Sequence, residues 1–140
     1  MAEAALHPKE RFKSVSPCFL VDDVVKSAEY YRDVLGFHFD RYWGKTACFV
    51  MLLRDSIEIS LSKPGGSRIV RPNRKMHAEA PWDAYIWVND LDPLHEELKR
   101  RGAKIVEAPA LRVYKCYEMV VEDSFGFRLC FSMDHSLKQS

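Results

Sequence analysis

The chain has 140 residues and a mass of 16.3 kDa, which is enough to bury one hydrophobic core but too short for two independent domains. Its 47% hydrophobic and 29% charged residues are typical of a globular protein and exclude a disordered chain. The chain has 21 Lys and Arg and 20 Asp and Glu, which gives a net charge of +1. This charge is too small to attract nucleic acid or an anionic membrane electrostatically, so we expect neither partner.

The N-terminal residues 1–13 mix acidic, basic and apolar side chains and lack the apolar core of a signal peptide. No stretch of the chain approaches the roughly 18 apolar residues that a membrane span needs. The four cysteines lie in apolar, strand-like runs without CxxC spacing, which favours buried thiols over disulfides: Cys18, Cys48, Cys116 and Cys130. These features predict a cytoplasmic protein.

The first predicted module spans about residues 14–62 and begins with a short apolar strand at 17–21. Asp23 can then cap an amphipathic helix that ends near Gly36. Three further strands are expected at 37–43, 46–53 and 57–62, joined by the turn-like pairs Gly44-Lys45 and Asp55-Ser56.

A segment rich in Pro and Gly, about residues 63–81, is predicted to be a linker or a lid. Its first part carries five basic residues and no acid, which either stay solvated or grasp an anion: Lys63, Arg68, Arg71, Arg74 and Lys75. The second predicted module, about 82–134, follows the order of the first. It has a strand at 84–88, a helix from Asp90 to Gly102, and strands at 104–107, 114–122 and 127–133.

The two modules also match in sequence, since Cys48, Met51, Asp55 and Ser56 pair with Cys116, Met119, Asp123 and Ser124 at one constant offset. The chain is therefore interpreted as an internal duplication within a single domain. The predicted fold is α+β, with two tandem βαβββ modules that form a cupped, mostly antiparallel sheet with the helices on the outside.

Alternate side chains along a strand point to opposite faces, so the apolar set of each strand should lie against the helices. This set includes Phe19, Ile59, Ile86 and Phe131. The opposite set should line the cup, where it gives a polar and aromatic surface: Ser16, Cys18, Leu20, Glu58, Ser60, Ser62, Asp83, Tyr85, Trp87, Arg128, Cys130 and Ser132.

The segment from Val21 to Phe37, VDDVVKSAEYYRDVLGF, resembles the helix signature of the glyoxalase, bleomycin-resistance and extradiol-dioxygenase superfamily, also called vicinal oxygen chelate proteins. The second module adds YIWVNDLD at 85–92 and EDSFGFRL at 122–129. In the latter, Ser124 and Phe127 replace the family's usual Pro and Asn within a turn. The resemblance covers nearly the whole chain and implies a homodimer, in which one chain's first half meets its partner's second half. Open sheet edges provide a physical motive for such pairing.

Family enzymes hold a divalent metal with His, Gln or Glu from the first and last strands of the two halves. The resemblance places Ser16, Ser60, Asp83 and Cys130 at these positions. Such metals need about three imidazole, carboxylate or thiolate ligands, and hydroxyls are poor substitutes. We therefore predict no bound metal and no cofactor, and members that bind bleomycin without catalysis become the nearer comparison.

Glu58 is the best candidate for a catalytic residue, because partial burial in the cup would raise its pKa towards that of a general base. The alternative is a solvated carboxylate or one paired with Arg128. Asp83 either contacts a ligand or caps a turn after Trp82. The predicted ligand-binding residues are Ser60, Asp83, Tyr85, Trp87, Arg128 and Cys130.

Two functions remain open on the sequence. The first is a binding protein that sequesters or senses an aromatic or cationic small molecule, with Tyr85 and Trp87 as a stacking surface. The alternative is a lyase, isomerase or dioxygenase acting on a small carbonyl, thiol-conjugated or phenolic substrate. That enzyme would need a metal held by other ligands, or a metal-free mechanism at Glu58.

Overall fold

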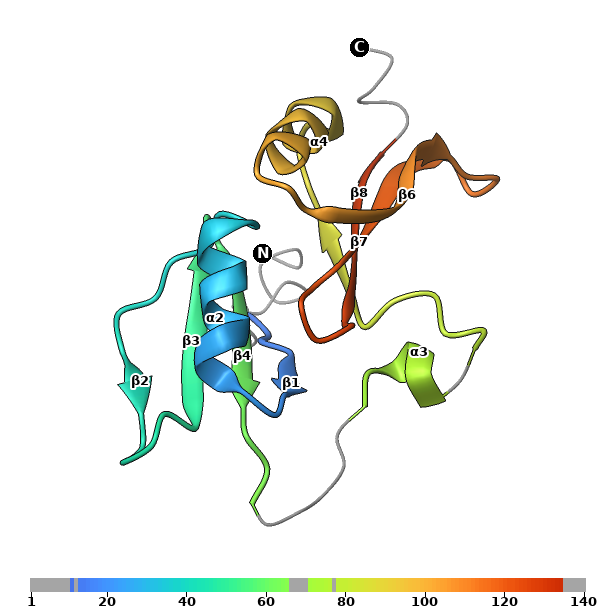
Figure 1. Ribbon diagram of the computed structural model, residues 1–140. Helices are drawn as coiled ribbons and strands as arrows, with labels where there is room; N and C mark the ends of the chain where they lie inside the picture. Colours follow the sequence, from blue (N-terminus) through green and yellow to red (C-terminus); the bar gives the residue numbers. More distant parts are fainter. Residues whose placement is uncertain (1–10, 12, 66–70, 77, 135–140) are drawn as a thin grey trace, which may run out of the picture.

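Two four-stranded sheets, one from each half of the chain, make up the fold (Figure 1). The computed structural model describes residues 11, 13–65, 71–76 and 78–134, so Arg68 of the basic linker lies outside the described residues. The first sheet has the order β1 (Cys18–Leu20), β4 (Ile57–Ser62), β3 (Phe49–Arg54), β2 (Tyr42–Trp43). The second has the order β5 (Ala84–Trp87), β8 (Arg128–Asp134), β7 (Cys116–Glu122), β6 (Lys104–Leu111).

Each sheet has the same connectivity, because β1–β4 and β5–β8 pair in parallel and the other neighbours pair antiparallel. Helix α2 (Val24–Asp33) follows β1, and α4 (Leu91–Arg100) follows β5. The short helix α3 (Asn73–Met76) lies in the connection between the modules. The structure thus confirms the predicted α+β fold of two tandem units. Among the described residues, no helix is long and apolar enough to cross a membrane.

Both helices end near the predicted glycines, but only the first has the predicted side-chain cap at its start. The Asp23 carboxylate accepts a hydrogen bond from the Lys26 backbone N–H at 3.0 Å, whereas Asp90 makes no side-chain capping bond to α4. Gly36 and Gly102, after the two helices, have φ of +78° and +82°. Glycine adopts this left-handed conformation without the steric cost of a Cβ, which explains why both helices end there.

Several strand limits differ from the prediction. Residues 37–43 were expected to form one strand, but only β2 and an isolated bridge between His38 and Leu53 form. Before the bridge, Phe37 packs into the core edge-on to Tyr31. Strand β6 continues to Leu111 despite Pro109, since it is an edge strand with register shifts, where a proline sacrifices no ladder hydrogen bond.

The matching residues of the repeat are not all equivalent in space. Met51 points away from α2 and is partly exposed, whereas Met119 is fully buried in the core. The cause is the hairpin turn: β3 and β4 are joined by Asp55 and Ser56 alone, whereas the turn between β7 and β8 is longer. Residues that match at the constant sequence offset are therefore displaced by one position in the two sheets, so Met51 and Met119 point to opposite faces.

The strand alternation is as predicted, and the apolar faces of both sheets join one hydrophobic core. Phe19 of the first module stacks on Phe127 of the second with ring centroids 4.3 Å apart. The Tyr31 hydroxyl of α2 donates to Asp123 at 2.7 Å. These contacts lie on the helix side of each sheet. The opposite side, which we call the cup face, is therefore turned away from the shared core.

Candidate functional site

The cup face of the second module places polar and aromatic side chains in two rows. Register pairs align Trp87, Ser132 and Glu118 across β5, β8 and β7. The neighbouring row consists of Tyr85, Cys130 and Val120. Tyr85 and Trp87 thus share this face with Cys130, as predicted from the alternation of β5 and β8.

Glu118 is the centre of this face, although only 1% of its surface is exposed. Its carboxylate accepts hydrogen bonds from the hydroxyls of Tyr85, at 2.7 Å, and Tyr114. The Arg112 Nε donates to it at 3.2 Å, while the Nη2 of the same guanidinium contacts Glu107 at 2.6 Å. A buried charge thus has the donors that it needs, two of them from the loop between β6 and β7.

The hydrogen bonds fix the protonation of the cluster. Burial alone would raise the pKa of Glu118, but hydrogen bonds from Tyr114, Tyr85 and Arg112 outweigh it and leave this pKa below its ordinary value. Burial and the bond to Glu118 raise the pKa of Tyr114 to about 12. Burial also raises the pKa of the Cys130 thiol, with the Glu118 charge as the second cause. At neutral pH the cluster therefore holds an ionised carboxylate and a neutral thiol, which suits binding better than base or nucleophile chemistry.

An aromatic surface lies beside the Glu118 cluster. The Trp87 side chain is 62% exposed, and its ring meets that of Tyr85 edge-on at 5.2 Å. On the other side of Tyr85, the Trp82 ring lies at 4.9 Å. An exposed indole, held in place by a tyrosine whose hydroxyl is itself fixed, can stack on a planar molecule.

Asp83 and Arg128 have other contacts. The two oxygens of Asp83 accept from the backbone N–H groups of Asn73, at 2.9 Å, and Arg128, at 2.8 Å. The Arg128 Nε donates to Glu122 at 3.3 Å, not to Glu58. The carboxylate of Asp83 therefore ties the connection between the modules to the start of β8.

The cup face of the first module is less polar. The Ser60 hydroxyl lies 3.2 Å from that of Ser16, so these two predicted residues are together. Within the described part of the chain, the Glu58 side chain has no hydrogen bond or ion pair. Leu20 and Met51 are 44% and 39% exposed on the same face. This surface offers hydrocarbon and hydroxyl groups, with one carboxylate.

The positions that the family resemblance gives for metal ligands are divided between the sheets, with Ser16 and Ser60 in the first and Asp83 and Cys130 in the second. Across the residues that the structure describes, no three or more His, Cys, Asp or Glu side chains gather closely enough to hold a metal ion. We expect elemental analysis of the purified protein to find iron, nickel, manganese and zinc well below one atom per chain. About one atom of any of them per chain would contradict this prediction.

Sequence reasoning missed Glu118 and Arg112. One signal was available: Glu118 is the only charged residue in the run CYEMVV, where a strand buried on both faces excludes an unpaired carboxylate. Its partners in the loop between β6 and β7 were not evident from the pattern.

Comparison with known proteins identifies the family to which this fold belongs. The model of the Glyoxalase/Bleomycin resistance protein/Dioxygenase superfamily matches residues 13–131. The chain belongs to this superfamily. No curated protein sequence matches the chain.

Solved structures of the superfamily share the fold at low identity. TioX from Micromonospora sp. ML1 is 16% identical with a TM-score of 0.67, over 88% of this chain and 99% of that one. A bleomycin-binding protein complexed with bleomycin is 17% identical with a TM-score of 0.67, over 88% and 99% of the two chains. A glyoxalase-related enzyme from Clostridium phytofermentans is 12% identical with a TM-score of 0.67, over 91% and 99%. At these low identities, the comparisons show that this chain shares its fold with these structures. Its activity must be inferred from the residues of its own site.

Proposed function

We propose that this protein binds a small planar molecule, aromatic or cationic, on the cup face of its second module and thereby sequesters or senses it. The single observation that carries the proposal is the largely exposed Trp87 indole beside the Tyr85 ring, over the buried Glu118 carboxylate. A stacking surface next to a fixed negative group suits a ligand with a flat apolar part and a positive or hydrogen-donating edge.

The charges of the cluster support a cationic edge. Glu118 and Glu107 share the single guanidinium of Arg112, which leaves one negative charge in excess. The lowered pKa of Glu118 keeps its charge at neutral pH. The neighbour solved with bleomycin adds that a chain of this fold can bind a drug-like molecule.

Tryptophan fluorescence tests the stacking surface. We expect titration with planar amines, phenols and glycopeptide drugs to change the emission of the wild-type protein, and Trp87→Phe to remove most of that change. Trp87→Ala should weaken binding about threefold to tenfold, because stacking contributes roughly 0.5 to 1.5 kcal/mol beyond area burial.

Trp43→Phe is the comparison variant, since this second exposed tryptophan lies beneath Arg41 on β2, on the cup face of the first module and not beside the Glu118 cluster. It should change the signal and the affinity less than the Trp87 substitutions do. Equal losses in the Trp43 and Trp87 variants would contradict a site on the second cup face.

We further propose that a second copy of the chain covers the cup faces and encloses the ligand. Most of the large exposed apolar side chains among the described residues lie on a cup face or in the β6–β7 hairpin: Leu20, Met51, Trp87, Leu111, Val113 and Tyr114. Exposed apolar surface of this kind marks an interaction site.

Light scattering at micromolar concentration should give twice the chain mass of 16.3 kDa. Met51→Glu should shift the protein towards the monomer, because it places a charge on the covered face. Val25→Glu is the control on the outer face of α2 and should leave the mass unchanged. A wild-type mass equal to one chain would overturn the dimer proposal.

A further inference from the structure

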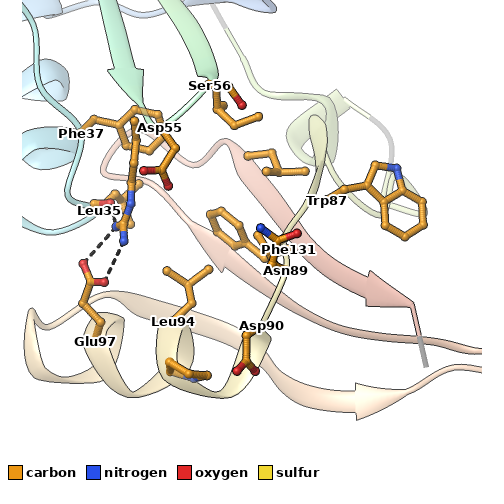
Figure 2. A pocket seen from close by; sticks show the side chains of 15 residues that line it. Leu35, Phe37, Asp55, Ser56, Trp87, Asn89, Asp90, Leu94, Glu97 and Phe131 are labelled. Atoms are coloured by element: carbon orange, nitrogen blue, oxygen red, sulfur yellow. Dashed lines mark hydrogen bonds and ion pairs between the residues drawn. The ribbon is translucent and has the colours of Figure 1, made fainter. Parts of the chain in front are cut away.

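A hollow lies on the helix side, between the two modules (Figure 2). It has a volume of about 380 Å³, within the usual range of roughly 300 to 1,000 Å³ for small-molecule pockets. The β3–β4 turn forms one wall, and the end of β5 with the first turns of α4 forms the other. Trp87 is among the residues that line this cavity, but Figure 2 shows its indole directed away from the other lining side chains.

The floor of the cavity is apolar, with side chains from both modules: Leu35, Phe37, Ile57, Ile86, Leu94 and Phe131. Four of these belong to the buried core, and Ile57 and Leu94 pack against it half-buried. An apolar ligand group that moves from water into a cavity with this hydrocarbon lining gains binding free energy.

The polar rim carries an imbalance of charge. Arg54 donates to the Leu35 carbonyl at 2.8 Å and forms a two-bond ion pair with Glu97, whose carboxylate also accepts from Arg101 at 2.9 Å. Asp55 and Asp90, on opposite walls, have no hydrogen-bond or ion-pair partner for their carboxylates among the residues that the structure describes. Arg100, the last residue of α4, and Arg101, its C-cap, line an open notch that adjoins the cavity and shares Arg54, Asp55 and Glu97 with it.

Asp55 is the carboxylate best placed to contact an occupant. Figure 2 shows it between the β3–β4 turn and α4, on the cavity side. Its backbone has a φ of +53°, which Asp and Asn tolerate better than other residues with a Cβ. Asp90 stands at the start of α4 without capping it, so its charge adds to the field at the rim.

We propose that this cavity is a second ligand site, which takes a small organic ammonium ion whose hydrocarbon part covers the apolar floor and whose charge lies against Asp55. Because the Trp87 indole points away from this cavity, the site is distinct from the stacking surface proposed for the cup ligand. Neutral molecules of the same shape bind more weakly, since they gain no electrostatic attraction to the Asp55 carboxylate.

Two-dimensional NMR of the isotope-labelled full chain tests this site with 3-phenylpropylammonium and its neutral analogue 3-phenylpropanol. The amine should give saturable shifts at Asp55, Ser56 and Asn89, and the alcohol should bind more weakly. Because Asp55 is exposed to solvent, Asp55→Asn should weaken amine binding about twofold to fivefold, the range for an exposed ion pair, and remove the preference over the alcohol. Asparagine keeps the left-handed turn, so the loss reports charge and not misfolding.

Two further variants complete the design. Leu94→Trp should abolish binding of both probes by filling the cavity, while Asp22→Asn, an exposed charge elsewhere, should change nothing. The proposal is overturned if no saturable shift occurs, if amine and alcohol bind equally, or if Asp55→Asn and Leu94→Trp leave binding unchanged. Shifts centred on Tyr85, Trp87 and Ser132 would place the amine in the cup, which would support the proposed function but overturn this one.

Discussion

Replacing Asp123 by Ala should lower the free energy of unfolding by about 3 kcal/mol, because it removes a buried carboxylate that accepts several hydrogen bonds. The side chain is only 4% exposed. One oxygen accepts from the backbone N–H groups of Phe125, Gly126 and Phe127 at 2.8 to 2.9 Å, and the other accepts from the Tyr31 hydroxyl. Denaturant unfolding monitored by circular dichroism measures the loss.

The same carboxylate holds the β7–β8 turn to α2, so its removal affects both modules. Burial raises the pKa of Asp123 more than its hydrogen bonds lower it, which means that the charge itself is costly there. Asp123→Asn, which keeps an acceptor without the charge, should therefore lose less stability than Asp123→Ala. Asp22→Ala, at an exposed aspartate, should stay within about 0.5 kcal/mol of the wild type. An equally small effect of Asp123→Ala would refute the proposed role.

Replacing Glu118 by Ala should cost about 2 to 3 kcal/mol of stability and weaken ligand binding roughly tenfold or more. The substitution removes the shared acceptor of Tyr85, Tyr114 and Arg112. Tyr85 keeps a partner, since its hydroxyl lies 2.7 Å from Ser132 Oγ, and Arg112 keeps Glu107. The main loss is therefore the fixed orientation of Tyr85 beneath Trp87, which chemical denaturation and ligand titration together detect.

Glu107→Ala is the matched control, because Glu107 contacts the same guanidinium from a largely exposed position and should cost less than about 1 kcal/mol. The effect of Glu118 should also depend on pH. Since its folded pKa is lowered, its contribution is present above the unfolded pKa, near 4.3, and is lost as pH falls through the folded value. The difference in stability between the wild type and Glu118→Gln should thus shrink from pH 7 to pH 3. A difference that stays constant would contradict an ionised Glu118 in the folded protein.

The sequence by itself determined the repeated architecture and the face of each main strand. Alternation in β4, β5 and β8 separates residues such as Ile86 from Trp87 because a pleated strand directs neighbours to opposite sides, whatever surrounds it. The helix ends at Gly36 and Gly102 were equally local, since they depend on the backbone freedom of single residues. For these reasons the fold and the exposed Trp87 were predictable.

Only the tertiary structure decided how the polar groups of the site pair. The partners of Glu118 depend on how the loop between β6 and β7 folds back over the sheet, and those of Asp83 on where the connection carries Asn73. Hydrogen bonds between distant residues need positions within a few tenths of an ångström, which no local pattern encodes. The cavity beside Asp55 has the same origin, because it exists only where the β3–β4 turn of one module meets α4 of the other.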